Sequence, residues 1–235
     1  MSKVLVIIPT YNERENIEKL CRKILTINQN YSILVIDDNS PDKTAQIVLN
    51  LKKQYPALFL LQRSKKLGLG SAYKEGFAWA QKYNFNQVVT MDGDFSHDPC
   101  FIPHLINLAQ SNDLVIGSRY VRGGKIIGFN IWRRFLSKSA NLFVRTIFRL
   151  KVSDATSGFR CYGEKLIQNL PWQKFQCENY AFLVEALFHA QRLGAKIAQL
   201  PISFVDRRRG LSKLGGGEIF SSFWDLVKLK LKIIR

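Results

Sequence analysis

A regular alternation of short apolar runs with longer amphipathic segments constrains the fold of this chain more than any other feature. The apolar runs are rich in Val, Ile and Leu and cover residues 4–8, 33–36, 57–61, 87–90 and 114–117. Between them, apolar residues recur every three or four positions, which is the period of an α-helix. Strands that alternate with helices form right-handed βαβ units. The first half therefore predicts an α/β fold with a mostly parallel, Rossmann-like sheet and helices on both faces.

Polar residues gather directly after three of the predicted strands. Tyr11, Asn12 and Glu13 follow the first strand, residues 37–38 follow the second, and residues 92–94 follow the fourth. Each cluster has a simple alternative interpretation as a set of loop-capping side chains. The carboxyl ends of parallel strands meet at one edge of a sheet, where open α/β folds bind nucleotides. We therefore expect the three clusters to form one ligand site.

The cluster at 92–94 contains two carboxylates one residue apart. Carboxylate oxygens are ligands that Mg²⁺ and Mn²⁺ prefer, and an ion held here could grip a diphosphate. The alternative is an acidic turn in which Asp98 caps a helix that begins near Pro99. Convergence with the other two clusters favours a ligand site over the capping interpretation.

Two familiar phosphate-binding motifs are missing from the sequence. No G-x-G-x-x-G follows the first strand, and no Walker lysine motif occurs anywhere. Gly68 and Gly70 form an isolated pair after the third strand, which we interpret as loosening a turn. Hydride-transfer enzymes and P-loop ATPases are therefore disfavoured.

Local sequence signals predict the bounds of further helices and strands. Ser40 as N-cap and Pro41 at the first helical position indicate a helix to about residue 54. In the second half, residues 178–193 predict a helix and residues 196–202 a strand. Pro201 lacks a backbone N–H, so that strand is expected at the edge of the sheet.

Charge is distributed unevenly along the chain. Of 35 Lys and Arg and 18 Asp and Glu, residues 1–118 hold 13 and 11, whereas residues 119–235 hold 22 and 7. The first half is thus near neutral at +2, and the second carries +15 of the net +17. Such asymmetry predicts an anionic partner for the second half: nucleic acid, an anionic membrane surface or a phosphorylated substrate.

The cysteines and the apolar runs bear on the compartment. Cys21, Cys100, Cys161 and Cys177 form no C-x-x-C pair, which argues against a structural zinc site and a disulfide framework. A reducing compartment is expected. The sequence has no signal-peptide pattern, and no apolar run approaches the roughly twenty residues of a membrane span. We expect a protein at the cytoplasmic face of a membrane that does not cross it.

Two segments of the second half predict helices that lie on a membrane surface. Residues 131–150 place Arg134 and Lys138 on one stripe and Leu136 on another face, and residues 218–235 interleave aromatic residues with lysines. Basic amphipathic helices of this kind meet lipid headgroups with their cations. The alternative for the first segment is a solvated helix that packs on the core.

A loop rich in glycine and cations covers residues 206–217. Flexible glycines and positive charge suit closure over phosphates. The competing interpretation is a solvated basic hairpin.

Several short segments carry a family resemblance. They are Pro-Thr-Tyr-Asn-Glu at 9–13, Asp-Asp-Asn-Ser at 37–40, Met-Asp-Gly-Asp at 91–94, Gly-Ser-Arg-Tyr at 117–120, Asp-Ala-Thr-Ser-Gly-Phe-Arg at 154–160 and Val-Asp-Arg at 205–207. Together they resemble the family 2 glycosyltransferases, and most of all the dolichyl-phosphate (polyprenyl-phosphate) mannose synthases. The resemblance runs over essentially the whole chain.

The resemblance implies both a fold and a reaction. It implies a GT-A domain over residues 1–217, with a nucleotide-binding half at 1–118 and an acceptor and phosphate-binding half at 119–217 that contains the interfacial helix 131–150. Residues 218–235 would add a basic amphipathic helix. The implied reaction transfers mannose from GDP-mannose to dolichyl or polyprenyl phosphate, inverts the anomeric carbon and uses Mg²⁺ or Mn²⁺.

Site residues follow from the resemblance position by position. The implied donor contacts are Pro9, Tyr11, Glu13, Ile36, Asp38, Asp92 and Gly93. Asp94 matches the metal-holding carboxylate, and Arg119, Arg207 and Lys213 match cations that hold donor or acceptor phosphates. Arg119 is also implied at the acceptor phosphate, as are two residues of the predicted interfacial helix, Arg133 and Ser137.

Two departures from the family pattern stand out. Many relatives have Ala where this chain has Gly93, and a backbone contact would survive that change. Some members continue into transmembrane helices, whereas this sequence stops at Arg235. The chain therefore resembles the short type, which relies on interfacial helices or on a membrane-embedded partner subunit.

The chemistry expected of such a site is charge stabilisation. The leaving GDP develops negative charge, which a divalent ion on Asp94 and the cations Arg207 and Lys213 would offset. A phosphate monoester has its second pKa at about 6, so the acceptor is largely dianionic at neutral pH and needs no strong base. His97 is therefore expected to be a loop residue.

Other functions share part of this pattern. A polyprenyl-phosphate glucosyltransferase that uses UDP-glucose would need nearly the same residues. A processive polysaccharide synthase is disfavoured, because the sequence has no Gln-x-x-Arg-Trp motif. A non-enzymatic module that binds anionic lipid or nucleic acid would account for the net charge alone. The glycosyltransferase interpretation expects no nucleic-acid partner.

Overall fold

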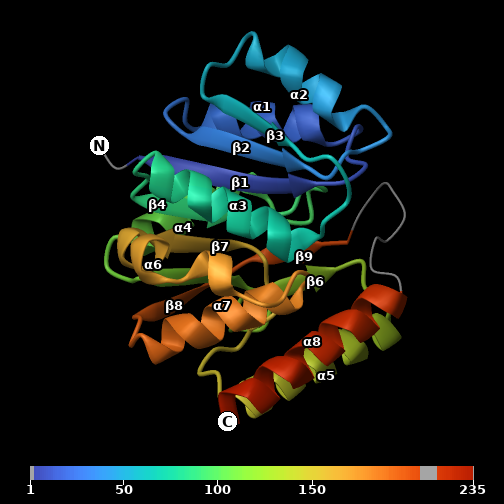
Figure 1. The fold of residues 1–235 in the computed structure, drawn as a ribbon, viewed down its shortest axis with the longest axis vertical. Coiled ribbons are helices and arrows are strands. Elements are labelled where there is room, and N and C mark those ends of the chain that lie inside the picture. The colour runs from blue at the N-terminus through green and yellow to red at the C-terminus, as the bar shows by residue number, and fades with distance from the viewer. Residues whose placement is uncertain (1–2, 207–215, 235) are drawn as a thin grey trace.

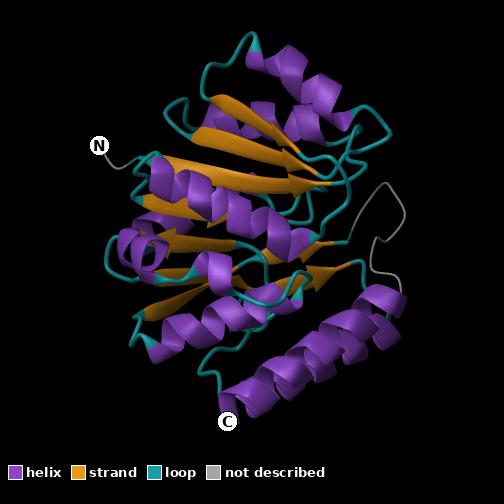
Figure 2. Ribbon diagram, viewed as in Figure 1, coloured by secondary structure: helices purple, strands orange, loops and turns teal. Residues whose placement is uncertain are grey.

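A seven-stranded sheet forms the centre of the computed structural model, which describes residues 3–206 and 216–234 (Figures 1 and 2). Its strands are β1 (Val4–Thr10), β2 (Ser32–Asp37), β3 (Leu58–Gln62), β4 (Gln87–Thr90), β5 (Leu114–Ser118), β7 (Arg160–Gly163) and β8 (Ile197–Pro201), in the order β3-β2-β1-β4-β7-β5-β8. β7 runs antiparallel to β4 and β5, and the other pairs are parallel. The mostly parallel sheet is confirmed.

Helices cover both faces of the sheet, as predicted. One face carries α3 (Leu69–Lys82), α6 (Glu164–Asn169) and α7 (Ala181–Arg192), and the other carries α1 (Ile17–Ile27), α2 (Thr44–Lys52) and α4 (Ile102–Leu108). Each face has its own buried apolar cluster. Leu5 and Ile7 of β1 face the first cluster, whereas Val4, Val6 and Ile8 face the second. Burial on both faces explains why these strands are continuous apolar runs.

The start of α2 differs from the prediction. The helix begins at Thr44, and Ser40 is not its N-cap. The Ser40 hydroxyl donates to Asp37 Oδ1 at 2.6 Å, and its backbone N–H donates to Asp37 Oδ2 at 2.9 Å. Asp42 Oδ1 instead accepts a hydrogen bond from the Thr44 N–H at 3.0 Å. The strand-end carboxylate of Asp37 thus holds Ser40 in the loop and delays the helix.

The second half contributes β7 and β8 to the main sheet and contains two short strands that were missed. β8 lies at the edge of the main sheet, with Pro201 as its last residue, which confirms the edge position. The missed strands are β6 (Lys125–Ile127) and β9 (Ser203–Val205), which pair in parallel as a small separate sheet. Three-residue strands carry too little periodicity to be recognised from sequence.

Two long helices, α5 (Ile131–Phe148) and α8 (Gly216–Ile234), lie side by side below the sheet in Figure 1. The rings of Phe143 and Phe223 join them, with centroids 5.5 Å apart. Val144 of α5 and Leu226 of α8 are buried in the core. The large apolar side chains that these helices expose form what we call the α5–α8 surface: Ile131, Trp132, Phe135, Leu136, Leu142, Phe143, Phe223, Trp224 and Leu231.

None of the helices in the described part of the chain combines the length and the hydropathy needed to span a membrane.

Candidate active site

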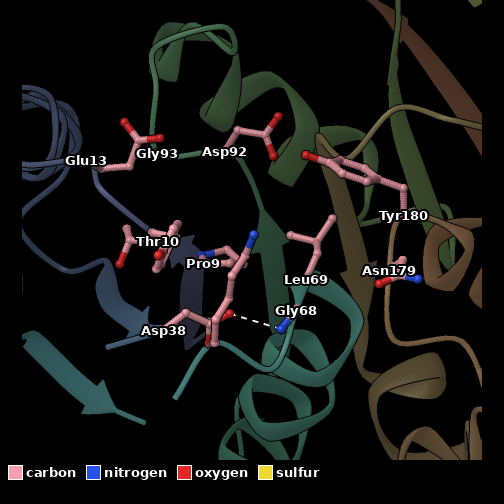
Figure 3. A pocket seen from close by; sticks show the side chains of 12 residues that line it. Pro9, Thr10, Glu13, Asp38, Gly68, Leu69, Asp92, Gly93, Asn179 and Tyr180 are labelled. Carbon is pink, nitrogen blue, oxygen red and sulfur yellow. Dashed lines mark hydrogen bonds between the residues drawn. The ribbon is translucent and has the colours of Figure 1, made fainter. Parts of the chain in front are cut away.

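A pocket opens at the carboxyl edge of the sheet (Figure 3). It is lined by Pro9, Thr10, Tyr11, Glu13, Asp38, Lys66, Gly68, Leu69, Asp92, Gly93, Asn179 and Tyr180. Pro9 and Thr10 end β1, Asp38 follows β2, and Asp92 and Gly93 follow β4. Because β1 pairs with both β2 and β4, the structure brings the three polar clusters together.

The pocket includes most of the donor residues that the resemblance implies. Those that line it are Pro9, Tyr11, Glu13, Asp38, Asp92 and Gly93. The side chain of Ile36 is fully buried in the core, so only its backbone can face a ligand. Asp94, in the loop after β4, and Arg119, directly after β5, are not among the lining residues. Which of these residues contact a donor stays a prediction.

Arg63, at the end of β3, holds the β2 side of the pocket and was missed in the sequence. Its guanidinium forms a buried ion pair with Asp38 and also donates to Ser71 Oγ at 2.9 Å and to the Gly68 carbonyl at 3.0 Å. Asp38 Oδ2 accepts the Gly68 N–H at 3.0 Å. Burial raises the pKa of Asp38, and the charge of Arg63 partly offsets that effect. Arg63 thus fixes both Asp38 and the start of α3.

The far wall of the pocket comes from a later segment of the chain, which follows Gly93 by 86 residues. Asn179 and Tyr180 precede α7, and Figure 3 shows the Tyr180 ring directed toward Asp92. Asn179 Nδ2 donates to Ser221 Oγ at 2.8 Å and to Asp225 Oδ2 at 3.0 Å, which ties the pocket to α8. No local pattern marks these two residues. The near wall adds Lys66, whose ammonium lies 4.9 Å from the Tyr11 ring centroid.

Gly70 explains how this late segment reaches the pocket. A Cβ on Gly70 would lie 2.6 Å from the carbonyl oxygen of Cys177, so only glycine allows the two backbones to approach. The Gly70 N–H donates to the Glu178 carbonyl at 2.8 Å. The glycine pair therefore serves a close backbone contact, and the interpretation as a loosened turn was incomplete.

The loop after β4 is held by hydrogen bonds from its own residues. The Asp92 N–H donates to His97 Nδ1 at 3.1 Å, and the His97 ring stacks on Phe159 with centroids 5.0 Å apart. Burial lowers the pKa of His97, so the imidazole is neutral at pH 7. Asp98 accepts the Cys100 N–H at 3.0 Å and caps the turn η1 (Pro99–Phe101). His97 as a loop residue and Asp98 as a cap match the sequence expectations.

The oxygen atoms beside Asp94 fit a hard divalent ion. Asp94 is buried, and its Oδ1 accepts the Ser96 N–H at 2.9 Å. The Ser96 hydroxyl is buried as well and has no hydrogen-bond partner among the described residues. An orphaned hydroxyl beside a carboxylate suits a cation that takes oxygen ligands. Within residues 3–206 and 216–234, no three His, Cys, Asp or Glu side chains gather to hold a metal unaided.

Arg119 is held by Asp154 in a buried bidentate pair. Arg119 Nε donates to Asp154 Oδ2 at 2.7 Å, and Nη2 donates to Oδ1 at 2.8 Å. Burial disfavours the Asp154 carboxylate, but the hydrogen bonds from Arg119 outweigh it and lower the pKa of Asp154. Burial also disfavours the charged guanidinium of Arg119, but the same hydrogen bonds outweigh this effect and raise the pKa of Arg119. Arg119 is therefore a fixed positive charge.

The residues implied for the acceptor phosphate lie on α5. Arg133 pairs with Asp206 at 2.6 Å, and the Ser137 hydroxyl lies 2.7 Å from the Tyr120 hydroxyl. Their spacing of four residues puts them on one face of the helix. Arg207 and Lys213, the other two implied cations, lie outside the described residues.

Comparison with known proteins identifies the family. A family model described as "Glycosyl transferase family 2" matches residues 5–170. The chain belongs to glycosyl transferase family 2. The family places this protein among the glycosyltransferases, as the sequence predicts.

Two curated relatives match this glycosyltransferase over most of their length. The undecaprenyl-phosphate mannosyltransferase of Micrococcus luteus is 36% identical over 215 residues, which cover 92% of this chain and 88% of the relative. The polyprenol monophosphomannose synthase of Mycolicibacterium smegmatis is 36% identical over 220 residues, which cover 92% of this chain and 83% of the relative.

Solved glycosyltransferase structures share the fold. One is the mannosyltransferase PcManGT from Pyrobaculum calidifontis in complex with GDP-Man and Mn²⁺. It matches with a TM-score of 0.60 at 15% identity, over 96% of this chain and 64% of that chain. At that identity the likeness concerns the fold alone, and it confirms the expected GT-A class.

Proposed function

We propose that this glycosyltransferase transfers mannose from GDP-mannose to a polyprenyl phosphate, such as dolichyl phosphate, with inversion at the anomeric carbon. The observation that carries the proposal is the 36% identity to two enzymes named for mannosyl transfer to polyprenyl phosphates, over most of each chain. The pocket supports it, because its polar residues stand where open α/β sheets bind nucleotides.

The nucleoside end of the donor would occupy the β1–β2 side of the pocket. Tyr11 offers a ring face, and Asp38 offers a carboxylate that Arg63 holds in place. Glu13 and Pro9 complete this side, and Ile36 would contribute its backbone. Asp92 and Gly93 stand at the β4 side, where the diphosphate and the sugar would follow.

Asp94 and the Ser96 hydroxyl would hold a Mg²⁺ or Mn²⁺ ion together with oxygen atoms of the donor. The structural neighbour with GDP-Man and Mn²⁺ supports this assignment by its fold. When bound, such an ion supplies positive charge beside the diphosphate as the leaving group becomes more negative.

Cationic side chains, some fixed and some exposed, would offset the remaining negative charge of the donor and acceptor phosphates. Arg119, locked by Asp154, would hold a phosphate in line with the anomeric carbon without reorganising during the reaction. Arg133 and Ser137 would take the acceptor phosphate, and Arg207 and Lys213 would take donor phosphates. Since the acceptor is already largely dianionic at neutral pH, it attacks without a base, and a single displacement inverts the sugar carbon.

The α5–α8 surface would lie against the cytoplasmic face of a membrane. Ile131 is 85% exposed and Trp132 is 75% exposed, and residues 119–151 carry nine basic and no acidic side chains. Aromatic residues that enter the headgroup region and cations that meet lipid phosphates bind such a surface together. A lipid acceptor would then meet Arg133 at the membrane surface.

The direct test is transfer to lipid. The protein is incubated with radiolabelled GDP-mannose, Mg²⁺ and dolichyl phosphate, and the lipid is extracted into butanol. Label is expected in the lipid phase, and alkaline or enzymatic analysis should give the β-anomer. Label from UDP-glucose but none from GDP-mannose would replace the mannose assignment with glucose. Binding to vesicles without transfer from either donor would favour a non-enzymatic module.

A further inference from the structure

Tyr73 carries a buried polar atom that the chemistry above does not use. It lies on α3, its side chain is fully buried, and its ring stacks on Phe182 with centroids 5.7 Å apart. The hydroxyl has no hydrogen-bond partner among the described residues. A buried hydroxyl without a partner destabilises the folded state, and a phenylalanine would fill the same space without that cost.

The unpartnered hydroxyl lies beside the donor pocket. A Cβ built on Gly158 would be 3.8 Å from the Tyr73 hydroxyl oxygen and 3.6 Å from Asp92 Oδ1. Both oxygens therefore border one small space, which the missing side chain of Gly158 leaves open. Asp92 lines the pocket on its other side.

Tyr73 is suited to donate to a carboxylate. Burial raises the pKa of its hydroxyl, and the nearby charge of Asp92 raises it further, so the group stays protonated at neutral pH. The Asp92 side chain is 27% exposed and lines the pocket, and its Oδ1 lies on the side of Gly158 and Tyr73. A neutral donor orients the carboxylate without cancelling its negative charge.

We propose that Tyr73 is a positioning residue: its hydroxyl donates a hydrogen bond to the Asp92 carboxylate when a nucleotide sugar fills the pocket. The bond fixes one carboxylate oxygen toward the core and directs the other toward the ligand. The inference rests on the proposed function only in requiring that Asp92 faces a sugar nucleotide. It assigns to α3, far from Asp92 in sequence, a part in donor affinity.

The test compares Tyr73→Phe with Tyr162→Phe. Tyr162 is an equally buried tyrosine of the same core cluster, but its hydroxyl lies 3.4 Å from Arg160 Nη1. Calorimetry measures the affinity for GDP-mannose and for UDP-glucose with Mg²⁺, and urea unfolding without ligand measures stability. Tyr73→Phe should be as stable as the wild type or more so and should bind the donor on the order of tenfold more weakly. Tyr162→Phe should lose stability and keep its affinity.

A second variant tests the shared space without altering Tyr73. Gly158→Ala places a methyl group at ordinary contact distance from both oxygens. It should weaken donor affinity to a similar degree, because the methyl group would occupy space that the hydroxyl and the carboxylate need in order to approach each other.

The outcomes separate this inference from the proposed function. Wild-type affinity in Tyr73→Phe, or a loss of stability with unchanged affinity, would overturn the inference and leave the mannosyltransferase proposal standing. If the wild type binds UDP-glucose and not GDP-mannose, the mannose proposal is wrong. The role of Tyr73 is then tested by the affinity of the variants for UDP-glucose. If the wild type binds neither donor, both proposals are wrong.

Discussion

The donor pocket and the α5–α8 surface handle charge in opposite ways. Around the pocket, cations are buried in fixed pairs, as Arg63 is with Asp38 and Arg119 is with Asp154. On the α5–α8 surface, apolar rings and basic side chains stand exposed on two helices. Most of the pocket lining lies in residues 1–118, whose net charge is +2, whereas both helices of the α5–α8 surface lie in residues 119–235, whose net charge is +15.

The difference indicates how each region would respond to substitution. A buried pair in a low-dielectric setting is sensitive to the loss of either partner, because the remaining charge is left without compensation. Exposed charges and rings contribute small, roughly independent amounts to binding, and salt reduces the part that comes from charge. We therefore expect large effects from single changes near the pocket and small, additive effects on the surface.

Asp94→Ala should have the largest effect. Removing the carboxylate proposed to hold the metal should lower the turnover rate by on the order of 100-fold or more, because charge on the leaving group would lose its stabilisation. Transfer from radiolabelled GDP-mannose measures the effect. If this variant still turns over substrate when the divalent ion is chelated, the assignment of Asp94 as a metal ligand is wrong.

Asp98→Ala is the matched control for Asp94, four residues along the same loop. Asp98 accepts the Cys100 N–H and pairs with Lys23 at 2.7 Å, and it does not line the pocket. Losing the cap should cost about 1 kcal/mol of unfolding free energy and leave turnover near that of the wild type.

Breaking the Arg119–Asp154 pair should give the largest change in stability. Asp154→Asn removes the charge that compensates a buried guanidinium, and the unfolding free energy should fall by about 3–5 kcal/mol. Urea unfolding at pH 7 measures this directly. A loss close to zero would mean that Arg119 finds another partner and is not a fixed charge.

The same pair predicts a pH dependence. The folded pKa of Asp154 is lowered from the ordinary value of 3.8, so the carboxylate stabilises the fold above that value. The contribution is lost as pH falls through the lower, folded pKa. The stability difference between the wild type and Asp154→Asn should therefore be constant from pH 7 to about 5 and narrow below pH 3.8. A difference that stays constant below that pH would contradict the lowered pKa.

Much of the pocket could be predicted from the sequence because strand ends are local features. Tyr11, Asp38 and Asp92 each follow an apolar run, and a parallel sheet must bring such ends to one edge. Arg63 also follows a strand, β3, but the sequence alone did not identify it. A single arginine after a strand has the pattern of a solvated side chain, and its partner Asp38 is recognisable only in three dimensions.

Residues that reach the pocket through long-range packing could not be predicted. Asn179 and Tyr180 carry no periodic signal, and they line the pocket because Gly70 lets their segment approach α3. Likewise, Ser40 has every local property of an N-cap, but Asp37 binds it first. In each case a contact between backbone and side chain in the tertiary structure overrides the local preference.

Arg63→Ala should affect donor binding more than catalysis. Without the guanidinium, Asp38 loses its ion pair and the Gly68 carbonyl loses a donor, so the affinity for GDP-mannose should fall by on the order of tenfold. Calorimetric titration measures this affinity. Arg22→Ala is the control, because Arg22 forms an exposed pair with Glu18 that should contribute little. Equal effects in the two variants would remove the distinction between buried and exposed pairs.

The smallest single effects are expected on the α5–α8 surface. Trp132→Ser removes a side chain that is 75% exposed and is proposed to enter the headgroup region. Because only part of the ring would leave water, binding to anionic vesicles should weaken by about tenfold or less, and Phe135→Ser should add a similar factor. Sedimentation with vesicles measures binding, and higher salt should weaken all variants further.

Leu49→Ser is the control that distinguishes a specific contact of the α5–α8 surface with the membrane from a general loss of exposed apolar surface. Leu49 is an exposed leucine on α2, across the sheet from α5, so its replacement should leave vesicle binding unchanged. Donor affinity should be unaffected in all three surface variants, because none of these side chains lines the pocket. If Leu49→Ser weakened vesicle binding as much as Trp132→Ser, lipid would be binding without a preferred face. A drop in donor affinity in Trp132→Ser would instead mean that the surface and the pocket are coupled, and the Asn179 contacts with α8 give that coupling a route.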